Sequence, residues 1–354
     1  IGEYYFFLLF REIDQLNKQG KNIINLGIGS PDLPPHPDVI KTLQQESIKP
    51  HVHGYQNYKG SPVLRNAIST WYKNFYSVDL DPDTEVLPLI GSKEGIMHIC
   101  MTYFQQGDTV LVPNPGYPTY SSAVKLSGAM PVYFDLLEKN NYQPDLAQLK
   151  ELSNAKAIFL NYPHMPVGAS MDMQTMKAVI DWATENNILI IHDNPYSFIL
   201  NETPQSLLSI DGAKNVVIEL NSLIKSHNMA GWRIGMLCAA KEKVNEVLRF
   251  KSNMDSGMFL PVQLAAAKAL TLGKEWHDEV NAIYSERREK VYAMLDILGC
   301  SYSKKQAGLF IWASVPAMYE DGYALCDKIL YHKNVFITPG GIFGTAGNHY
   351  IRIS

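Results

Sequence analysis

The amino-acid sequence predicts an α/β fold: a large domain with a mostly parallel sheet sandwiched by helices, plus a smaller α+β domain. The chain has 354 residues, about twice the usual domain length, which favours two domains or one large α/β unit. Up to about residue 240, short continuous apolar runs alternate with amphipathic stretches. Strands covered on both faces are apolar throughout, so this alternation indicates a parallel sheet with helical crossovers.

Individual elements follow from hydrophobic spacing and from the residues at their ends. The stretches 61–75 and 92–104 carry apolar residues at helical spacing, and the second begins at Ser92, a residue type that favours helix N-termini. The apolar runs that we predict to be strands are EVLPLI (85–90), TVLVP (109–113), MPVYF (130–134), AIFLNYP (157–163), ILIIHD (188–193) and NVVIEL (215–220).

After residue 240 the pattern changes, because long helical stretches now dominate and strands are few. We predict a large domain of residues 40–270 and a small domain made of residues 1–39 and 271–354. The predicted elements of this part are helices at 241–250, 261–270, 275–298 and 323–332, and strands within 308–315 and 348–354. The long helix at 275–298 is expected to link the two domains.

Composition and charge exclude several classes of partner. The net charge of -4 is spread without basic or acidic blocks, so we expect neither nucleic acid nor an anionic membrane as a partner. No run approaches the roughly 18 apolar residues that a membrane-spanning helix needs. The four cysteines are scattered without the spacing of a metal site, which predicts reduced thiols, no metal centre and a cytoplasmic protein.

The stretch NSLIKSHNMAGWRIGM (221–236) places one lysine among apolar and small residues. Lys225 has the Ser222 hydroxyl three residues before it and Arg233 eight residues after it. A lysine near an apolar strand end is most often exposed, with only its stem buried. A buried lysine instead has a lowered pKa and can attack an aldehyde as a neutral amine. The nearby hydroxyl and guanidinium would suit a phosphate on the same molecule, so the three groups indicate pyridoxal 5'-phosphate.

In order and spacing, this stretch resembles the lysine segment of the fold-type I aminotransferases of class I and II. Their segment reads S-x-x-K, followed by small residues and then G-x-R-x-G, and the resemblance extends from NLGIGSPD to YIRIS. It implies a large domain with a sheet of the seven-stranded type. It also implies that Lys225 carries the cofactor and that Ser222 and Arg233 bind its phosphate.

Two further segments match cofactor-binding motifs of that family. In IIHDNPYSF, Asp193 ends an apolar strand, where α/β sheets bind ligands, and a carboxylate there can keep the pyridine nitrogen protonated. The alternative is a loop aspartate that caps a turn. The resemblance implies that the Tyr196 hydroxyl meets the phenolic oxygen of the ring. In LIGSKEGI it adds the backbone of Ser92 and Lys93 to the phosphate contacts, at a helix N-terminus that favours anions.

The resemblance also assigns an aromatic contact, a subunit contact and two substrate contacts. Tyr117, in the turn PNPGYPTY, would stack on the pyridine ring, and Tyr55 would reach the phosphate of the other subunit, which requires a homodimer. Arg352 of NHYIRIS would hold the substrate α-carboxylate with its planar fork, near the Gly29 backbone. Without the resemblance, Tyr117 is a structural loop residue and Arg352 a strand arginine facing solvent.

One segment departs from the family pattern. The family usually has N-P-T-G after the strand at 157–163, but here Met165 replaces the asparagine that donates to the phenolic oxygen, and Val167 replaces the threonine. Methionine cannot donate; His164 is one candidate replacement, whereas Asn161 lies four residues earlier. One lost hydrogen bond to a charged group costs roughly 1.5–3 kcal/mol, so the other contacts should still hold the cofactor.

The sequence therefore predicts an aminotransferase that moves an amino group between an amino acid and a 2-oxo acid. The expected mechanism is ping-pong, through an aldimine of Lys225. Two alternatives keep the fold and the cofactor: a carbon–sulfur β-lyase and a decarboxylase. A third is a non-catalytic binding protein that retained the fold, for which Met165 is the only support. No second arginine can be assigned to a side-chain carboxylate, so an acidic substrate is neither supported nor excluded.

Overall fold

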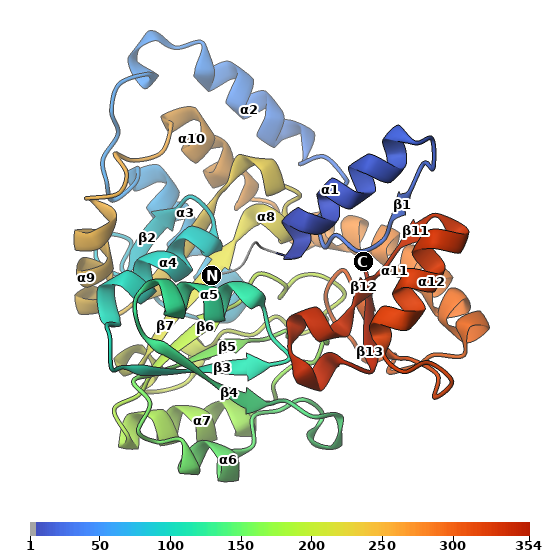
Figure 1. Ribbon diagram of the computed structural model, residues 1–354. Coiled ribbons are helices and arrows are strands. Elements are labelled where there is room, and N and C mark those ends of the chain that lie inside the picture. Colours follow the sequence, from blue (N-terminus) through green and yellow to red (C-terminus); the bar gives the residue numbers. More distant parts are fainter. Residues whose placement is uncertain (1–4) are drawn as a thin grey trace.

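The computed structural model describes residues 5–354, and its largest element is a sheet of seven strands in the order β2-β8-β7-β6-β5-β3-β4 (Figure 1). Every neighbouring pair is parallel except the two pairs of β8, which runs antiparallel to β2 and to β7. The strands are β2 (Val86–Leu89), β3 (Thr109–Asn114), β4 (Met130–Asp135), β5 (Ala157–Asn161), β6 (Leu189–Asp193), β7 (Val217–Ser222) and β8 (Gly235–Ala239).

Helices cover both faces of this sheet, because successive residues of its inner strands are apolar on both sides. Within β5, Ile158 and Leu160 pack toward one face and Phe159 toward the other. The first face is covered by α3 (Pro62–Tyr76), α7 (Met173–Glu185) and α10 (Leu260–Ala269), with α2 (Pro37–Ser47) packed on α10. The second face is covered by α4 (Ser92–Tyr103), α5 (Pro118–Leu126) and α9 (Lys241–Lys251).

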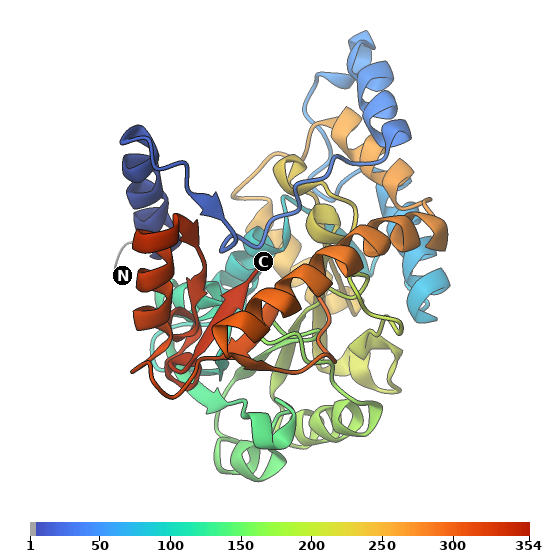
Figure 2. The ribbon, with the colours of Figure 1, turned by 90° about the vertical axis from the view of Figure 1, so that its right-hand side faces the viewer.

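A smaller sheet of four antiparallel strands, in the order β12-β13-β10-β9, forms the core of the second part. The long helix α11 (Lys274–Leu298) connects the two parts. Its residue Tyr284 packs against the loop that follows β5, and its residue Leu295 packs into the small sheet. Figure 2 shows α11, in orange, crossing the molecule obliquely from the large part to the small, red part. The strands are β9 (Ser301–Tyr302), β10 (Ile311–Ser314), β12 (Thr338–Pro339) and β13 (Tyr350–Ile353).

The N-terminal segment lies on this smaller part. Leu9 and Ile13 of α1 (Tyr5–Lys18) pack on Leu330 of α12 (Gly322–Lys333) and on Phe336. The short strand β1 (Ile24–Asn25) pairs in parallel with β11 (Val335–Phe336). The backbone then passes Phe336 so closely at Gly27 that any side chain there would overlap the ring. The remaining helices are α6 (Leu146–Glu151) and α8 (Leu223–Ser226).

The predicted fold class is confirmed: a mostly parallel sheet sandwiched by helices, beside a smaller α+β part. The predicted boundaries at residues 39/40 and 270/271 stay predictions. The sequence analysis did not identify β8, the strand that breaks the parallel pattern. Within residues 5–354, no helix combines the length and the apolar character needed to cross a membrane.

Candidate active site

A cavity of about 300 Å³ lies at the carboxyl ends of β5, β6 and β7, where it also meets the small sheet. Crevices at this edge are where α/β sheets bind ligands. All the residues predicted for the site except Tyr55 line this cavity: Gly29, Ser92, Lys93, Tyr117, Asp193, Tyr196, Ser222, Lys225, Arg233 and Arg352. The fold thus gathers segments that lie as far apart in the sequence as Gly29 and Arg352.

Sheet register brings the predicted phosphate-binding residues together. Gly235 of β8 pairs with Ser222 of β7 on one side and with Leu89 of β2 on the other, so three strand ends meet. Ser92 then opens α4 three residues beyond Leu89. A Cβ atom at Gly235 would lie 2.8 Å from the backbone nitrogen of Ser92, closer than side-chain carbons come to other atoms. Glycine at 235 therefore keeps this helix N-terminus open.

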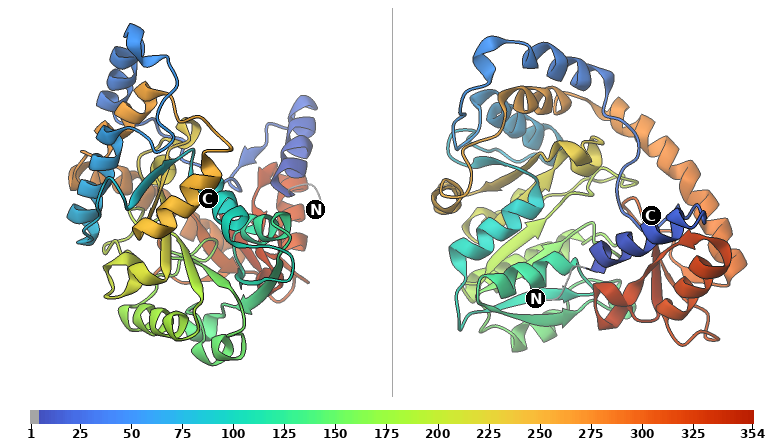
Figure 3. Two further views of the ribbon diagram at one scale, coloured as in Figure 1. Left: turned by 90° about the vertical axis from the view of Figure 1, so that its left-hand side faces the viewer. Right: turned by 45° about the horizontal axis from the view of Figure 1, so that its top comes forward.

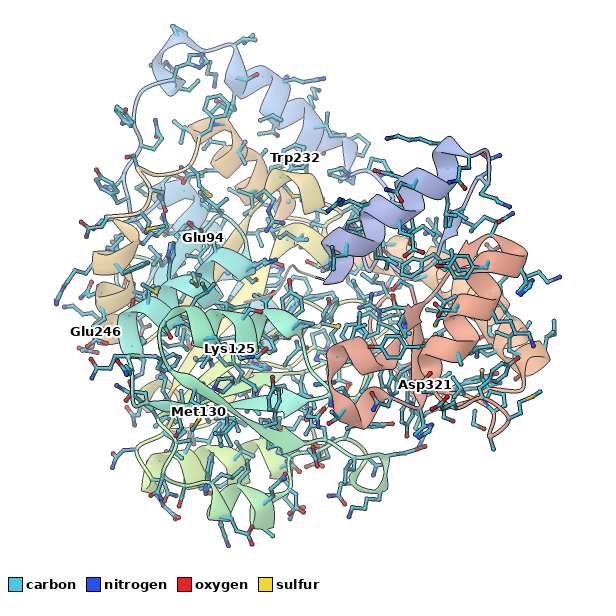
Figure 4. All side chains as sticks on the ribbon, viewed as in Figure 1. Glu94, Lys125, Met130, Trp232, Glu246 and Asp321 are labelled. Atoms are coloured by element: carbon cyan, nitrogen blue, oxygen red, sulfur yellow. The ribbon has the colours of Figure 1, made fainter. Side chains whose placement is uncertain are left out.

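The turn before α4 shapes the same end of the cavity. Gly91 has φ 84°, in the left-handed region that favours glycine, and a Cβ atom there would lie 2.6 Å from Nη2 of Arg233. Arg233 itself has φ 58° and donates through Nη1 to the Ala230 carbonyl at 3.2 Å. Glu94, labelled in Figure 4, accepts a hydrogen bond from the Ile90 nitrogen at 2.5 Å and so fixes the turn.

Asp193 lines the cavity and is buried. Its Oδ2 accepts a hydrogen bond of 2.9 Å from the Tyr120 hydroxyl, whereas its Oδ1 has no hydrogen-bond partner among residues 5–354. Burial raises the pKa of this carboxyl to about 6, although the Tyr120 bond and nearby Lys225 act in the opposite direction. A buried carboxylate oxygen without a partner is costly, so the site suits a ligand that brings a donor.

Lys225 projects into the cavity from α8, directly after β7. Its Nζ donates to the Gly29 carbonyl of the N-terminal segment. Burial and, to a smaller extent, the positive charges of Arg352 and Arg233 lower the pKa of this amine to about 8. A larger share of Lys225 is therefore neutral near pH 7 than for an ordinary lysine, as a nucleophilic amine requires.

Arg352 is buried on β13, with 4% of its surface exposed, so the alternative of a solvent-facing strand arginine is wrong. Its Nη2 donates to the Gly27 carbonyl at 2.5 Å, and its Nη1 lies 3.4 Å from the Met165 sulfur. Its Cζ lies 4.8 Å from the ring centroid of Phe343. A Cβ atom at Gly29 would lie 3.7 Å from Nη1, so Gly29 passes beside the fork of the guanidinium.

Met165 lines the cavity at the position where the family has a hydrogen-bond donor. Two neighbouring residues of the segment after β5, Asn161 and His164, could in principle donate instead. Asn161 uses its amide on the backbone: Oδ1 accepts from the Met165 nitrogen at 2.8 Å, and Nδ2 donates to the Asp193 carbonyl at 2.7 Å. His164 is fully buried outside the cavity lining, 5.6 Å from the Tyr162 ring, and burial lowers its pKa to about 3. His164, one candidate for the missing donor, therefore does not face the cavity.

Two tyrosines stand apart from the residues predicted to line the cavity of one chain. Tyr55, predicted to reach the phosphate of the other subunit, is 95% exposed and lies outside the cavity of its own chain; its contact with a partner stays a prediction. Tyr120, which the sequence analysis missed, binds Asp193 and packs edge-on against Tyr117 at 5.5 Å. The spacing of three residues between Tyr117 and Tyr120 could have indicated this pair, because it places both on one face of a helix. Other cavity residues not predicted are Phe10, Ile28, Ile96, Pro195, Ile224 and Phe343.

The fold and the cavity together agree with the family to which the sequence is similar. The chain belongs to the aminotransferase class I and II family, whose family model matches residues 21–354. It is an aminotransferase, an enzyme that moves an amino group between an amino acid and a 2-oxo acid. The predicted family and reaction are thereby confirmed, and the lyase, decarboxylase and non-catalytic alternatives are set aside.

Named relatives and solved structures match almost the whole chain. LL-diaminopimelate aminotransferase of Dehalococcoides mccartyi is 40% identical over 355 residues, covering 99% of this chain and 91% of its own. The Aquifex aeolicus protein of the same name is 38% identical and covers 99% and 92%. The substrate-bound structure of BacF from Bacillus subtilis has a TM-score of 0.95 at 36% identity, covering 100% and 91%. N-succinyldiaminopimelate aminotransferase from Mycobacterium tuberculosis has a TM-score of 0.90 at 27% identity, covering 98% and 92%.

Proposed function

We propose that this aminotransferase uses pyridoxal 5'-phosphate and binds it in the cavity at the strand ends. The observation that carries the proposal is the unpartnered Oδ1 of buried Asp193 in the same cavity as Lys225, whose pKa is lowered. A protonated pyridine nitrogen would supply the donor that Oδ1 lacks. When bound, the cofactor supplies an aldehyde that condenses with amines and a ring that accepts the electron pair of a substrate carbanion.

The remaining polar residues suit the other groups of that cofactor. Ser222, Arg233 and the backbone nitrogens of Ser92 and Lys93 would bind the phosphate at the glycine-lined start of α4. The two aromatic side chains would contact the ring, Tyr117 by stacking and Tyr196 through its hydroxyl. Positive groups would thus surround the anionic end, and Asp193 would provide the negative charge at the ring nitrogen.

Lys225 and Arg352 would carry the reaction itself. Lys225 would hold the cofactor covalently and, once the substrate amine has taken its place, move the proton between the substrate Cα and the cofactor C4'. A pKa of about 8 lies near neutral pH, where a general base can both take and return a proton. Arg352, beside the Gly29 backbone, would bind the substrate α-carboxylate and so orient the Cα–H bond.

A second copy of the chain would complete the site as a homodimer. Tyr55 lies on a surface where other large apolar side chains are exposed, among them Tyr58, Met254 and Phe259. The two segments that carry them touch, because the His53 and Phe259 rings stack at 5.8 Å. Exposed apolar surface of this kind marks interfaces, and Tyr55 would there reach the phosphate of the partner.

The four cysteines are free thiols, which fits a cytoplasmic enzyme.

Covalent trapping tests the cofactor proposal. Protein reconstituted with pyridoxal 5'-phosphate is reduced with borohydride, digested and mapped by mass spectrometry; the label is expected on the peptide that contains Lys225. Lys243 is a matched control, since burial lowers its pKa as well, but it lies on α9 outside the cavity. Lys243→Ala should label normally and Lys225→Ala should not. A label elsewhere, or none in fully reconstituted protein, contradicts the proposal.

The names of the relatives suggest one amino donor to test, LL-diaminopimelate. LL-diaminopimelate is the substrate that several relatives are named for, so it is the compound against which other donors must be compared. A half-reaction makes that comparison directly, because each amino acid is mixed with cofactor-loaded enzyme and conversion of the cofactor is followed by absorbance.

A further inference from the structure

The cavity wall around Arg352 is apolar. Met165 and Phe343 contact the guanidinium, at 3.4 Å from the sulfur and 4.8 Å from the ring centroid. Ile28 lines the cavity directly before Gly29, whose backbone passes the same guanidinium. A substrate whose carboxylate lies on Arg352 therefore has its α-carbon and side chain next to apolar groups of three separate segments.

The helix α1 adds an aromatic ring to this wall. Leu9 and Ile13 are one helical turn apart and pack into the core formed with α12 and β11. Phe10 follows Leu9 by about 100° of helical rotation, so its side chain leaves that core and lines the cavity, with 38% of its surface exposed. Figure 3 shows α1 lying beside the small part of the molecule. A large apolar residue is thus held at the cavity by a helix anchored elsewhere.

Each charged side chain of the cavity has a proposed partner, either a group of the cofactor or the α-carboxylate of the substrate. Within the described chain, the charged residues that line the cavity are Lys93, Asp193, Lys225, Arg233 and Arg352. Lys93 and Arg233 would stand at the phosphate end, Asp193 would face the ring nitrogen, Lys225 would face the aldehyde, and Arg352 would bind the α-carboxylate. A second carboxylate or ammonium on the substrate would have no counter-ion from this chain, and an unpaired buried charge is strongly disfavoured.

The geometry points to an amino acid with a large apolar, preferably aromatic, side chain as the substrate, packed against Phe10, Ile28 and Phe343. This inference rests on the proposed function, because it needs the α-carboxylate on Arg352. The inferred substrate differs from LL-diaminopimelate, because LL-diaminopimelate carries an ammonium and a carboxylate at its far end. Aromatic rings pack well against other rings, and Phe10 and Phe343 offer two.

The first test compares amino donors in the half-reaction. Cofactor-loaded enzyme is mixed in turn with L-phenylalanine, L-tyrosine, L-leucine, L-glutamate and LL-diaminopimelate, and the rate of cofactor conversion is divided by donor concentration. L-phenylalanine or L-tyrosine should exceed L-glutamate and LL-diaminopimelate by at least about tenfold, which corresponds to 1.4 kcal/mol. If either charged donor reacts fastest, or all react equally, the aromatic assignment is overturned while amino transfer stands.

The second test uses ligands that cannot react. Calorimetry on cofactor-loaded protein measures the dissociation constants of 3-phenylpropionate, propionate and glutarate. Phe10→Ala should weaken 3-phenylpropionate roughly 5- to 20-fold and leave propionate unchanged, given that each tenfold is 1.4 kcal/mol. Leu8→Ala is the matched control, because Leu8 is similarly exposed on α1 but lies outside the cavity lining.

The two tests separate the inference from the function on which it rests. Preferential binding of 3-phenylpropionate without conversion of any amino acid would contradict amino transfer but support the apolar pocket. Tighter binding of glutarate than of 3-phenylpropionate, or an equal effect of Phe10→Ala and Leu8→Ala, would overturn the pocket whatever the reaction.

Discussion

The two halves of the cavity are built in different ways. The half proposed for the cofactor consists of polar residues at the ends of neighbouring strands, such as Ser222 and Asp193, whose positions follow from the register of one sheet. The half proposed for the substrate combines Phe10, Phe343 and Arg352, from segments at opposite ends of the chain. Changes in one half should therefore leave the other largely intact.

The largest effect is expected where the two halves meet, at Lys225. Lys225→Ala removes both the covalent attachment and the group that moves the proton, so turnover should fall by at least about 10²- to 10⁴-fold, the usual contribution of a general base. Stopped-flow absorbance of the half-reaction measures the loss, and added methylamine should restore part of it. A variant that keeps more than a tenth of wild-type turnover would show that proton transfer lies elsewhere.

Arg352→Gln should damage the substrate half alone. The substrate carboxylate would lose its buried ionic partner, which costs about 2–5 kcal/mol, so kcat/KM should fall roughly 30-fold or more. The affinity of the cofactor should stay as in wild type. Arg287→Gln is a suitable control, because that arginine pairs with Asp32 at 2.7 Å outside this cavity. Loss of cofactor together with activity in Arg352→Gln would contradict the independence of the halves.

Asp193→Asn should act on the cofactor half. It should raise the free energy of unfolding of the apo-protein near neutral pH but lower the affinity for the cofactor. In the apo-protein the pKa of Asp193 is raised to about 6 from 3.8, so the folded state holds this proton more tightly than the unfolded chain. Its stabilising contribution is present below about pH 4 and is lost as the pH rises to about 6, by about 3 kcal/mol at 1.36 kcal/mol per unit.

The asparagine variant has no such ionisation, so its apo-protein should exceed wild type in free energy of unfolding by up to about 3 kcal/mol above pH 6, with little difference near pH 4. Cofactor affinity should fall instead, because the charge pair with the ring nitrogen is lost. Urea unfolding at pH 4.5 and 7, with and without cofactor, measures both. Parallel pH profiles of the two apo-proteins would show that burial does not shift the pKa of Asp193.

The difference between the cofactor half and the substrate half also explains which cavity residues could be predicted from the sequence. Lys225, Asp193 and Ser222 were predictable because each sits in a local motif at a strand end. Phe10 and Phe343 were not, because an apolar residue carries no local sign of whether it faces a core or a cavity. That distinction depends on the packing of Leu9 against Leu330, which lies far away in the sequence.

Strand β8 was missed, and His164 was named as a candidate donor, for similar reasons. The sequence GMLCA of β8 contains no β-branched or aromatic residue, so its strand propensity is weak, and pairing with β2 and β7 on both sides determines its structure. His164 was judged by its position next to Met165. Adjacent residues in an irregular segment can point in different directions, and here only Met165 faces the cavity.

Met165 lies against Arg352 of the substrate half and lines the same cavity as the cofactor half, and its replacement should give the smallest effect. Methionine cannot donate a hydrogen bond to the phenolic oxygen of the cofactor, whereas asparagine in Met165→Asn can. The donor would stabilise negative charge on that oxygen, so the pH midpoint of the visible absorbance change should fall by about one unit, or 1.36 kcal/mol, within the range for such a bond. Met165→Leu keeps an apolar side chain of similar size, and its midpoint should match wild type.

The same asparagine should weaken the substrate half, because it replaces the sulfur that lies 3.4 Å from Nη1 of Arg352 with a polar amide in an apolar wall. We therefore expect 3-phenylpropionate to bind a few-fold more weakly to Met165→Asn than to Met165→Leu, by about 1 kcal/mol or less. An unchanged or higher absorbance midpoint in Met165→Asn would mean that another group already donates to the phenolic oxygen. Tighter binding of 3-phenylpropionate would mean that Met165 does not belong to the apolar wall.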